Sequence, residues 1–195
     1  GEVRVEGRSA RIRSPRDATR LGISYLPEDR LNQGLFIAQS IGRNIIVTVL
    51  NKILSAVGLI SAQKRDETIR KWIRELEIKT PGAEVPAQSL SGGNQQRVVL
   101  AKWLATEPKI FILDGPTIGV DIASKSTIHS IIRGLAEKGM GIIIISDEIP
   151  EILQNCNRVL VMSGGRIVRE YADTAGLSED ELFSAVSGKE EAKTA

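Results

Sequence analysis

Hydrophobic and polar positions along the chain follow two patterns, which together predict a mixed α/β fold. Short apolar runs at residues 22–26, 110–113 and 142–145 are typical of strands. Apolar residues three and four positions apart within residues 62–76 predict an amphipathic helix. Because a helical stretch at residues 125–137 separates the last two strands, we expect these strands to be parallel, in a sheet covered on both faces.

Two hairpins are predicted nearer the ends of the chain. Residues 3–5 and 10–12 flank a Glu-Gly turn, and residues 158–162 and 166–171 flank a Ser-Gly-Gly turn. A short capped helix is predicted at residues 178–186. We expect these elements to accompany the parallel sheet.

The longest apolar stretch, residues 45–60, lies in a helical region that covers residues 40–104. It is shorter than the roughly 20 residues of a membrane-spanning helix and contains Asn51 and Lys52. We therefore expect a packed helix here. A further helix is predicted at residues 94–105.

Composition narrows the class of function. With 195 residues, 42% of them hydrophobic, the chain is long enough to bury a core. Its 26 Lys and Arg are almost balanced by 24 Asp and Glu, so no nucleic-acid partner is expected. A single cysteine, Cys156, excludes an internal disulfide and agrees with a reducing compartment.

A carboxylate, Asp114, directly follows the apolar run at residues 110–113. The carboxyl ends of parallel strands are where open α/β sheets bind ligands, so Asp114 is a candidate binding residue. The alternative is that Asp114 caps a turn, and this motif alone does not decide between them.

Residues 90–96 (LSGGNQQ) open a helix with a hydroxyl, Ser91, and two residues without side chains, Gly92 and Gly93. Backbone N–H groups at such a helix end approach an anion closely, and the helix dipole favours negative charge there. The alternative is simple capping of the helix by Ser91.

Together, residues 90–96, 110–114, 116–117 and 119–121 resemble the layout of ABC-type ATPase cassettes. With residues 22–30 (GISYLPEDR), nearly the whole chain resembles the second, C-terminal cassette of ATP-binding subunits from bacterial sugar importers. Such importers take ribose, galactose, xylose or arabinose. The implied fold class is α/β: a partial ABC-type cassette with a parallel-sheet core, a helical signature lobe and short antiparallel hairpins.

The resemblance implies that residues 1–195 form one partial cassette with four parts. Residues 1–34 would hold a hairpin, a helix and a strand leading into a Q-loop-like segment. Residues 35–105 would form the helical lobe with the signature motif. Residues 106–171 would form the Walker B sheet and a hairpin, and residues 172–195 a helix and a tail.

The resemblance also implies roles at the nucleotide. Ser91, Gly92, Gly93 and Gln95 would be the signature that contacts the γ-phosphate of ATP held by an opposing cassette. Asp114 would orient Mg²⁺ through water. The expected cofactors are thus ATP and Mg²⁺, although the isolated chain is not expected to bind them.

Two further residues are implied to face partners. Asp121 would lie at the interface with a second cassette, arranged head to tail. Glu28, where most cassettes have glutamine, would lie in the loop that couples the nucleotide to the transmembrane permease subunits. The implied location is cytoplasmic, on the inner face of the cell membrane.

The chain departs from the family pattern in its phosphate loop. A Gly-x-x-x-x-Gly-Lys-Ser/Thr loop would wrap the ATP phosphates, but the one Gly-Lys pair is Gly188-Lys189, with Phe183 where the first glycine should stand. Because the first residue is Gly1, we expect that an N-terminal part of the cassette is missing.

The predicted nucleotide site departs at two more positions. Gly115 follows Asp114, where a glutamate normally polarises the attacking water, and a general base is typically worth about 10²- to 10⁴-fold in rate. Asp147 stands where a histidine usually contacts the γ-phosphate. The alternative is that another carboxylate substitutes for the missing one. The single histidine, His129, is expected to have a surface or packing role.

Three functions remain open from the sequence. The leading hypothesis is that the chain supplies its signature to a partner cassette while its own site is degenerate. A regulatory or scaffolding module that docks the membrane subunit is the second hypothesis. The third is a self-sufficient ATPase in DNA repair or translation, which hydrolysis by the isolated chain would support.

Overall fold

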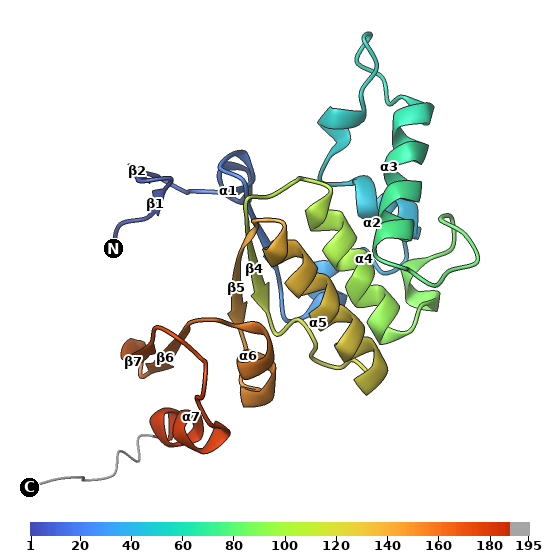
Figure 1. The fold of residues 1–195 in the computed structure, drawn as a ribbon. Helices are drawn as coiled ribbons and strands as arrows, with labels where there is room; N and C mark the ends of the chain where they lie inside the picture. Colours follow the sequence, from blue (N-terminus) through green and yellow to red (C-terminus); the bar gives the residue numbers. More distant parts are fainter. Residues whose placement is uncertain (188–195) are drawn as a thin grey trace, which may run out of the picture. The chain divides into compact units, whose positions relative to one another are not determined.

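The computed structural model describes residues 1–187, which divide into two units, Gly1–Ile145 and a second that begins at Ser146. Figure 1 shows the course of the chain through both. Within the described residues, no helix is long and apolar enough to cross a membrane. The predicted tail at residues 189–195 and the Gly188-Lys189 pair lie outside the described residues.

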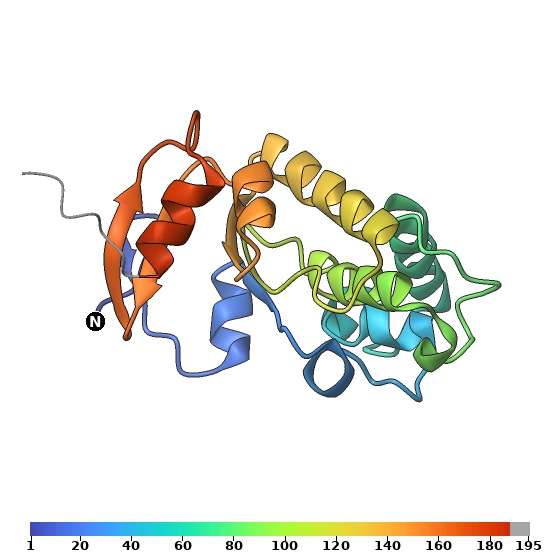
Figure 2. The same cartoon turned by 90° about the horizontal axis from the view of Figure 1, so that it is seen from below.

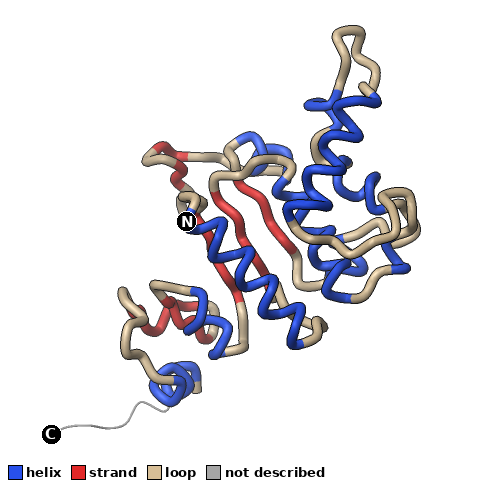
Figure 3. Tube along the Cα trace, turned by 45° about the vertical axis from the view of Figure 1, so that its right-hand side comes forward, coloured by secondary structure: helices blue, strands red, loops and turns tan. Residues whose placement is uncertain are grey.

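Three parallel strands form the sheet of the first unit, in the order β3 (Ile23–Leu26), β4 (Ile110–Asp114) and β5 (Gly141–Ile145). The helix α5 (Ile122–Glu137) connects β4 to β5 and crosses the sheet in Figure 3. The predicted parallel arrangement of β4 and β5 is therefore confirmed. The register pairs Leu26 with Leu113.

One face of this sheet is buried and the other is open. Phe111 and Leu113 are fully buried in a core that includes residues of α4 (Gly92–Leu104) and α5. On the opposite face, Tyr25, Ile143 and Ile145 are 42%, 51% and 50% exposed. The prediction of a sheet covered on both faces is wrong for this unit, because α4 and α5 share one core on the same side.

A helical lobe follows β3 along the chain. A short π-helix (Arg30–Gly34) leads into it, and Ser40 caps the start of its first helix. The other helices of the lobe pack against the apolar residues of α4. The lobe contains α2 (Ile41–Ile46), a 3₁₀ turn (Leu50–Ile53), α3 (Ala62–Glu75), a second 3₁₀ turn (Ala87–Ser89) and α4.

The prediction of one packed helix at residues 45–60 is wrong. Helix α2 ends at Ile46, and a turn at residues 55–59 reverses the chain, with the Ser55 N–H donating to the Leu59 carbonyl at 2.7 Å. Val57 and Leu59 are 80% and 70% exposed on this loop, at the top of Figure 1. Here a turn interrupts an apolar run that the sequence pattern alone suggests is continuous.

The smaller elements agree with the predicted hairpins, with shifted ends. The first hairpin pairs β1 (Arg4–Val5) with β2 (Arg8–Ser9), so residues 10–12 are not a strand. It is followed by α1 (Pro15–Arg20), capped by Ser14. In the second unit, β6 (Val159–Ser163) pairs with β7 (Arg166–Tyr171), next to α6 (Ile149–Asn155) and α7 (Glu179–Val186).

The second unit has a small core of its own. Val159 and Val161 of β6 pack against Leu182 and Ala185 of α7. Figure 2 shows α7 lying against the β6–β7 hairpin. Ser178 and Glu181 form a capping box at the start of α7, which satisfies two backbone N–H groups.

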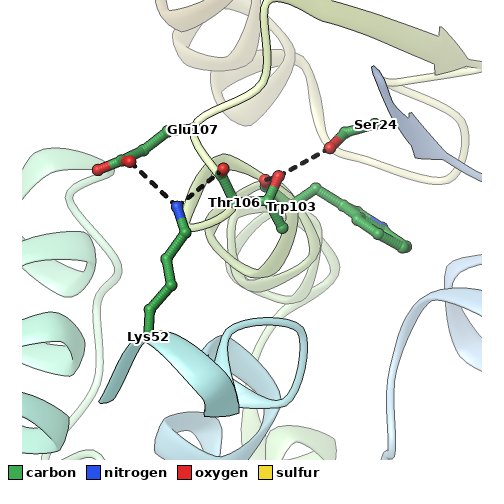
Figure 4. Close-up of polar contacts among 5 residues, drawn as sticks. All are labelled: Ser24, Lys52, Trp103, Thr106 and Glu107. Carbon is green, nitrogen blue, oxygen red and sulfur yellow. Dashed lines mark hydrogen bonds and ion pairs between the residues drawn. The ribbon is translucent and has the colours of Figure 1, made fainter. Parts of the chain in front are cut away.

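A polar junction joins the helical lobe to the sheet at the end of α4 (Figure 4). Thr106 donates to the Trp103 carbonyl at 2.7 Å, so the Ser24 hydroxyl of β3, 2.9 Å away, donates to Thr106. Lys52 of the lobe donates to the Thr106 carbonyl and to Glu107, both at 3.0 Å. The end of α4 is thus held from the sheet and from the lobe.

Lys102 is a buried cation on α4. Its side chain is 5% exposed, and its ammonium group donates to the carbonyl of Gly34 at the end of the π-helix. Burial lowers the pKa of Lys102 to about 8, because the charged form loses its hydration. The folded chain therefore releases this proton at a lower pH than the unfolded chain.

We predict that Lys102 makes the stability of the chain rise with pH. Below about pH 8 the folded and unfolded chains both carry the charge, and the folded state bears the whole cost of burial. Above that pH the unfolded chain binds more protons, so the free energy of unfolding should rise, by at most about 1.4 kcal/mol per pH unit. Urea unfolding of the wild type and Lys102→Met at pH 6.5, 7.5, 8.5 and 9.5 tests this. The free energy of unfolding of the wild type should rise relative to that of the variant only above about pH 8. A difference between the two free energies that stays constant with pH contradicts the prediction.

Candidate functional site

The N-terminal end of α4 carries the predicted signature residues. Ser91 is exposed and occupies the position before the first helical residue. Its hydroxyl makes no capping bond to a backbone N–H and instead accepts from the Asn94 amide at 3.0 Å. The simple capping role considered for Ser91 is therefore absent, and the first N–H groups of a helix of 13 residues stay available at this end.

The two signature glycines lie where neighbouring segments approach closely. A Cβ on Gly93 would lie 2.3 Å from Oγ of Ser124, in the first turn of α5. One on Gly92 would lie 3.0 Å from the carbonyl oxygen of Gly119. Both positions therefore exclude a side chain for reasons of packing, independently of any nucleotide.

Gln95 faces away from the helix end. Its side chain is 8% exposed, and its amide donates to the Ala87 carbonyl at 3.4 Å, inside the lobe. The structure thus places Ser91, Gly92 and Gly93 at the helix end and Gln95 beneath them. A contact of Gln95 with ATP stays a prediction.

Asp114 ends β4 and is paired with a residue from the neighbouring strand. The Tyr25 hydroxyl donates to Oδ2 of Asp114 at 2.7 Å. This hydrogen bond raises the pKa of Tyr25, and burial adds to the shift. Tyr25 was not among the predicted site residues. It lies in β3, which pairs with β4, three positions before the predicted Glu28.

Gly115 has a backbone conformation that disfavours other residues. Its φ is +53°, and a Cβ there would lie 2.4 Å from the end of the Ile118 side chain. The same Cβ would lie 3.2 Å from Cγ of Glu28, so the structure brings the predicted Glu28 beside the position that lacks a carboxylate. Glu28 is thus the side chain from which a substitute carboxylate could come.

Asp121 caps α5 at the end of the loop that follows Gly115. Its Oδ1 accepts from the Ser124 N–H at 3.0 Å. Hydrogen bonds from the Ser124 backbone and side chain lower the pKa of Asp121, so it stays ionised. The side chain is exposed, and a place at an interface between cassettes stays a prediction.

Arg30 is a second site residue that the sequence did not indicate. Its guanidinium group donates to the carbonyl of Ile118 at 2.7 Å and to that of Gly119 at 3.0 Å. It thus joins the segment after β3 to the loop after β4. The sequence around Arg30 does not indicate its partners, because they are backbone carbonyls.

Three other residues of interest lie elsewhere. Asp147 is exposed in the second unit, just before α6, and its role stays a prediction. His129 is 8% exposed on α5, which agrees with the expected packing role. Burial, with the nearby charge of Glu151, raises the pKa of Cys156 to about 11, so its thiol stays protonated near neutral pH.

The described residues do not form a metal site by themselves. No group of three or more His, Cys, Asp or Glu side chains among residues 1–187 is placed to hold a metal ion. Mg²⁺ is usually held by one or two carboxylates together with substrate phosphates and water. Asp114 fits that limited role, since its carboxylate lies at the end of a strand and Tyr25 occupies only Oδ2.

Comparisons with known proteins agree with this geometry. Residues 1–118 match the family described as ABC transporter. The chain belongs to the ABC transporter family. A solved ATP-binding cassette of an ABC transporter superposes on 94% of the chain with a TM-score of 0.77 and 20% identity, covering 74% of that structure. A second solved structure is a dimeric ATP-binding cassette in a post-hydrolysis state, bound to ADP and phosphate. The match covers 88% of this chain and 72% of that chain, with a TM-score of 0.72 and 22% identity. These likenesses show the α/β fold of an ABC cassette.

Within the ABC family, several relatives match almost the whole chain. A ribose import ATP-binding protein from Rhizobium etli is 42% identical over 195 residues, which are 100% of this chain and 38% of the relative. A ribose import ATP-binding protein from Geobacillus kaustophilus is 40% identical over 188 residues, which are 96% of the chain and 38% of the relative. The chain thus spans well under half the length of these relatives.

We predict that Gly93 is needed for the packing of α4 against α5. Gly93→Ala should lower the free energy of unfolding by about 1–3 kcal/mol, because its Cβ would overlap Ser124. Gly134→Ala, in a part of α5 where a Cβ meets nothing within 4 Å, is the control and should stabilise by about 0.5–1 kcal/mol. Adding Ser124→Gly to Gly93→Ala should restore part of the loss in urea unfolding. Equal stabilities of Gly93→Ala and the wild type would refute the overlap.

We predict that Tyr25 ionises at unusually high pH. The chain has two tyrosines, and absorbance at 295 nm follows their ionisation. Asp114→Asn should move the Tyr25 titration to lower pH, because the carboxylate that holds its proton is gone. Tyr25→Phe identifies the Tyr25 component, and circular dichroism checks that the chain stays folded. Identical titrations of the wild type and Asp114→Asn count against the hydrogen bond.

Proposed function

We propose that the chain is the signature-bearing part of an ATP-binding subunit in an ABC-type sugar importer. It would supply Ser91, Gly92 and Gly93 to ATP bound by a second cassette, packed head to tail. The observation that carries this proposal is the exposed end of α4, where Ser91 does not cap the helix. The identity of 42% to a ribose import protein supports the substrate class.

The electrostatics at this helix end suit a γ-phosphate. The first N–H groups of α4 have no intrahelical partners, and the dipole places roughly half a positive charge at this end. The Ser91 hydroxyl can donate to a phosphate oxygen while it accepts from Asn94. Because Gly92 and Gly93 have no side chains, a polyanion can approach the backbone closely.

The chain's own nucleotide site is proposed to be degenerate. Gly115 has no proton acceptor for the attacking water, and Asp147 would place a further negative charge near the γ-phosphate. No phosphate loop sequence is present among the 195 residues. When bound, Mg²⁺ would neutralise the phosphate charge. Asp114, oriented by Tyr25, would hold a metal-bound water.

The expected organisation of the chain follows from this proposal. Residues 1–34 would form the Q-loop side, 35–105 the signature lobe, 106–171 the Walker B region and hairpin, and 172–195 the C-terminal helix and tail. Glu28 would face the transmembrane permease subunits, and Asp121 the second cassette. The assembly would lie on the cytoplasmic face of the membrane.

A docking module with a vestigial signature is the alternative. The burial of Gln95 in the lobe and the packing roles of Gly92 and Gly93 favour it, because each residue then has a structural reason without a nucleotide. In that case the helical lobe would crosslink to the permease, but ATP would not drive pairing with the other cassette.

Ser91→Arg in the assembled importer tests the proposal. A bulky cation at the exposed helix end should block the partner's nucleotide, and transport-coupled ATPase activity should fall at least about tenfold. Ser130→Arg, which adds the same charge at an exposed position of α5, should leave activity near the wild-type value. Unchanged activity in Ser91→Arg, without pairing driven by ATP, would favour the docking module instead.

A further inference from the structure

Arg30 touches two segments that are distant from it in the sequence. Its Nη1 and Nη2 atoms donate to the carbonyls of Ile118 and Gly119. A Cβ on Gly92 would lie 2.9 Å from Nη2, so the guanidinium group lies against the first residue of α4. One side chain therefore joins the segment after β3, the loop at residues 115–121 and the signature end of α4.

The loop at residues 115–121 is held at a third carbonyl as well. Gln96, which is 1% exposed on α4, donates to the Pro116 carbonyl at 2.9 Å. Together Gln96 and Arg30 occupy three carbonyls within four residues of the loop, and Asp121 then begins α5. Two elements therefore hold the loop backbone: α4 through Gln96, and the π-helix through Arg30.

The segment that carries Arg30 is capped by its own Asp29 at the start and bonded to α4 at the end. Asp29 accepts from the N–H groups of Leu31 and Asn32, at 3.2 and 3.1 Å. At the other end of the π-helix, the Gly34 carbonyl accepts from the buried Lys102 of α4. Arg30 therefore extends from a segment that is bonded to α4, and it donates to the loop at residues 115–121.

Arginine suits this position in a way that lysine does not. Its planar fork reaches two neighbouring carbonyls at once, whereas an ammonium group is a single charged point on a flexible stem. Nε of Arg30 is buried and has no partner among residues 1–187. The fork is thus directed at Ile118 and Gly119 even though one donor is left unpaired.

We propose that Arg30 is a positioning residue that sets the geometry in which Ser91 meets the partner cassette's nucleotide. This inference rests on the proposed function. Arg30 acts through the loop at residues 115–121 and through the backbone at Gly92, and it does not touch ATP. Because it lies two residues after Glu28, it also links the segment expected to face the permease to the signature.

The test is Arg30→Ala in the assembled importer. The kcat for ATP hydrolysis should fall about tenfold to a hundredfold, the range for losing one or two charge-assisted hydrogen bonds. The KM for ATP should stay within about twofold, because the partner's phosphate loop binds the nucleotide. Methylguanidine added to Arg30→Ala should restore part of kcat. The kcat of Arg30→Lys should lie between those of Arg30→Ala and the wild type.

Controls separate a positioning role from a structural one. Arg16→Ala, at an exposed position of α1, removes the same charge and should leave kcat unchanged. If Arg30→Ala does not fold, Arg30→Lys carries the test: amide exchange at residues 116–121 should quicken while α3 keeps its protection. Unchanged exchange there in Arg30→Lys overturns the proposal.

Three results on the transporter distinguish this inference from the proposed function. If Ser91→Arg is inactive but Arg30→Ala keeps the wild-type kcat, the role of Arg30 is wrong and the shared site stands. A loss in Arg30→Ala that methylguanidine does not restore also overturns it. If Ser91→Arg is fully active, the proposed function itself fails.

Discussion

The parallel pairing of β3 with β4 is the constraint on which the candidate site depends. In this register Tyr25 lies beside Ile112, so its hydroxyl reaches Asp114, the next residue on the same face. The segments that leave both strands then begin side by side, which brings Glu28 to Gly115 and Arg30 to the following loop. A shift of one residue would turn these side chains to the opposite face and into the core.

Packing and the proposed function would both exclude side chains at the start of α4. Close approach of α5 excludes a side chain at Gly93, and the Gly119 carbonyl limits Gly92. A polyanion would exclude side chains there as well. Packing alone therefore accounts for both glycines, and the distinguishing residue is Ser91, whose exposed hydroxyl has no capping role.

Several polar side chains in the interior donate to backbone carbonyls of segments that are distant in the sequence. Lys102 reaches Gly34, Gln96 reaches Pro116 and Arg30 reaches the loop beyond it. Such bonds join segments that are distant in the sequence, and they add directional contacts to the apolar packing. The cost is visible at Lys102, where burial removes hydration from the charged form and lowers the pKa to about 8.

The sequence by itself determined the class of fold, the parallel arrangement of β4 and β5 and the presence of two hairpins, because hydrophobic period and glycine spacing are local properties. It also named Asp114 and Ser91 as candidates from their places at a strand end and a helix start, and Glu28 through a resemblance. Only the tertiary structure decided that one face of the sheet is open, that residues 45–60 contain a turn, and that Tyr25 and Arg30 belong to the site. Those features depend on strand register and on bonds to distant carboxylates and carbonyls, which no pattern along the chain records.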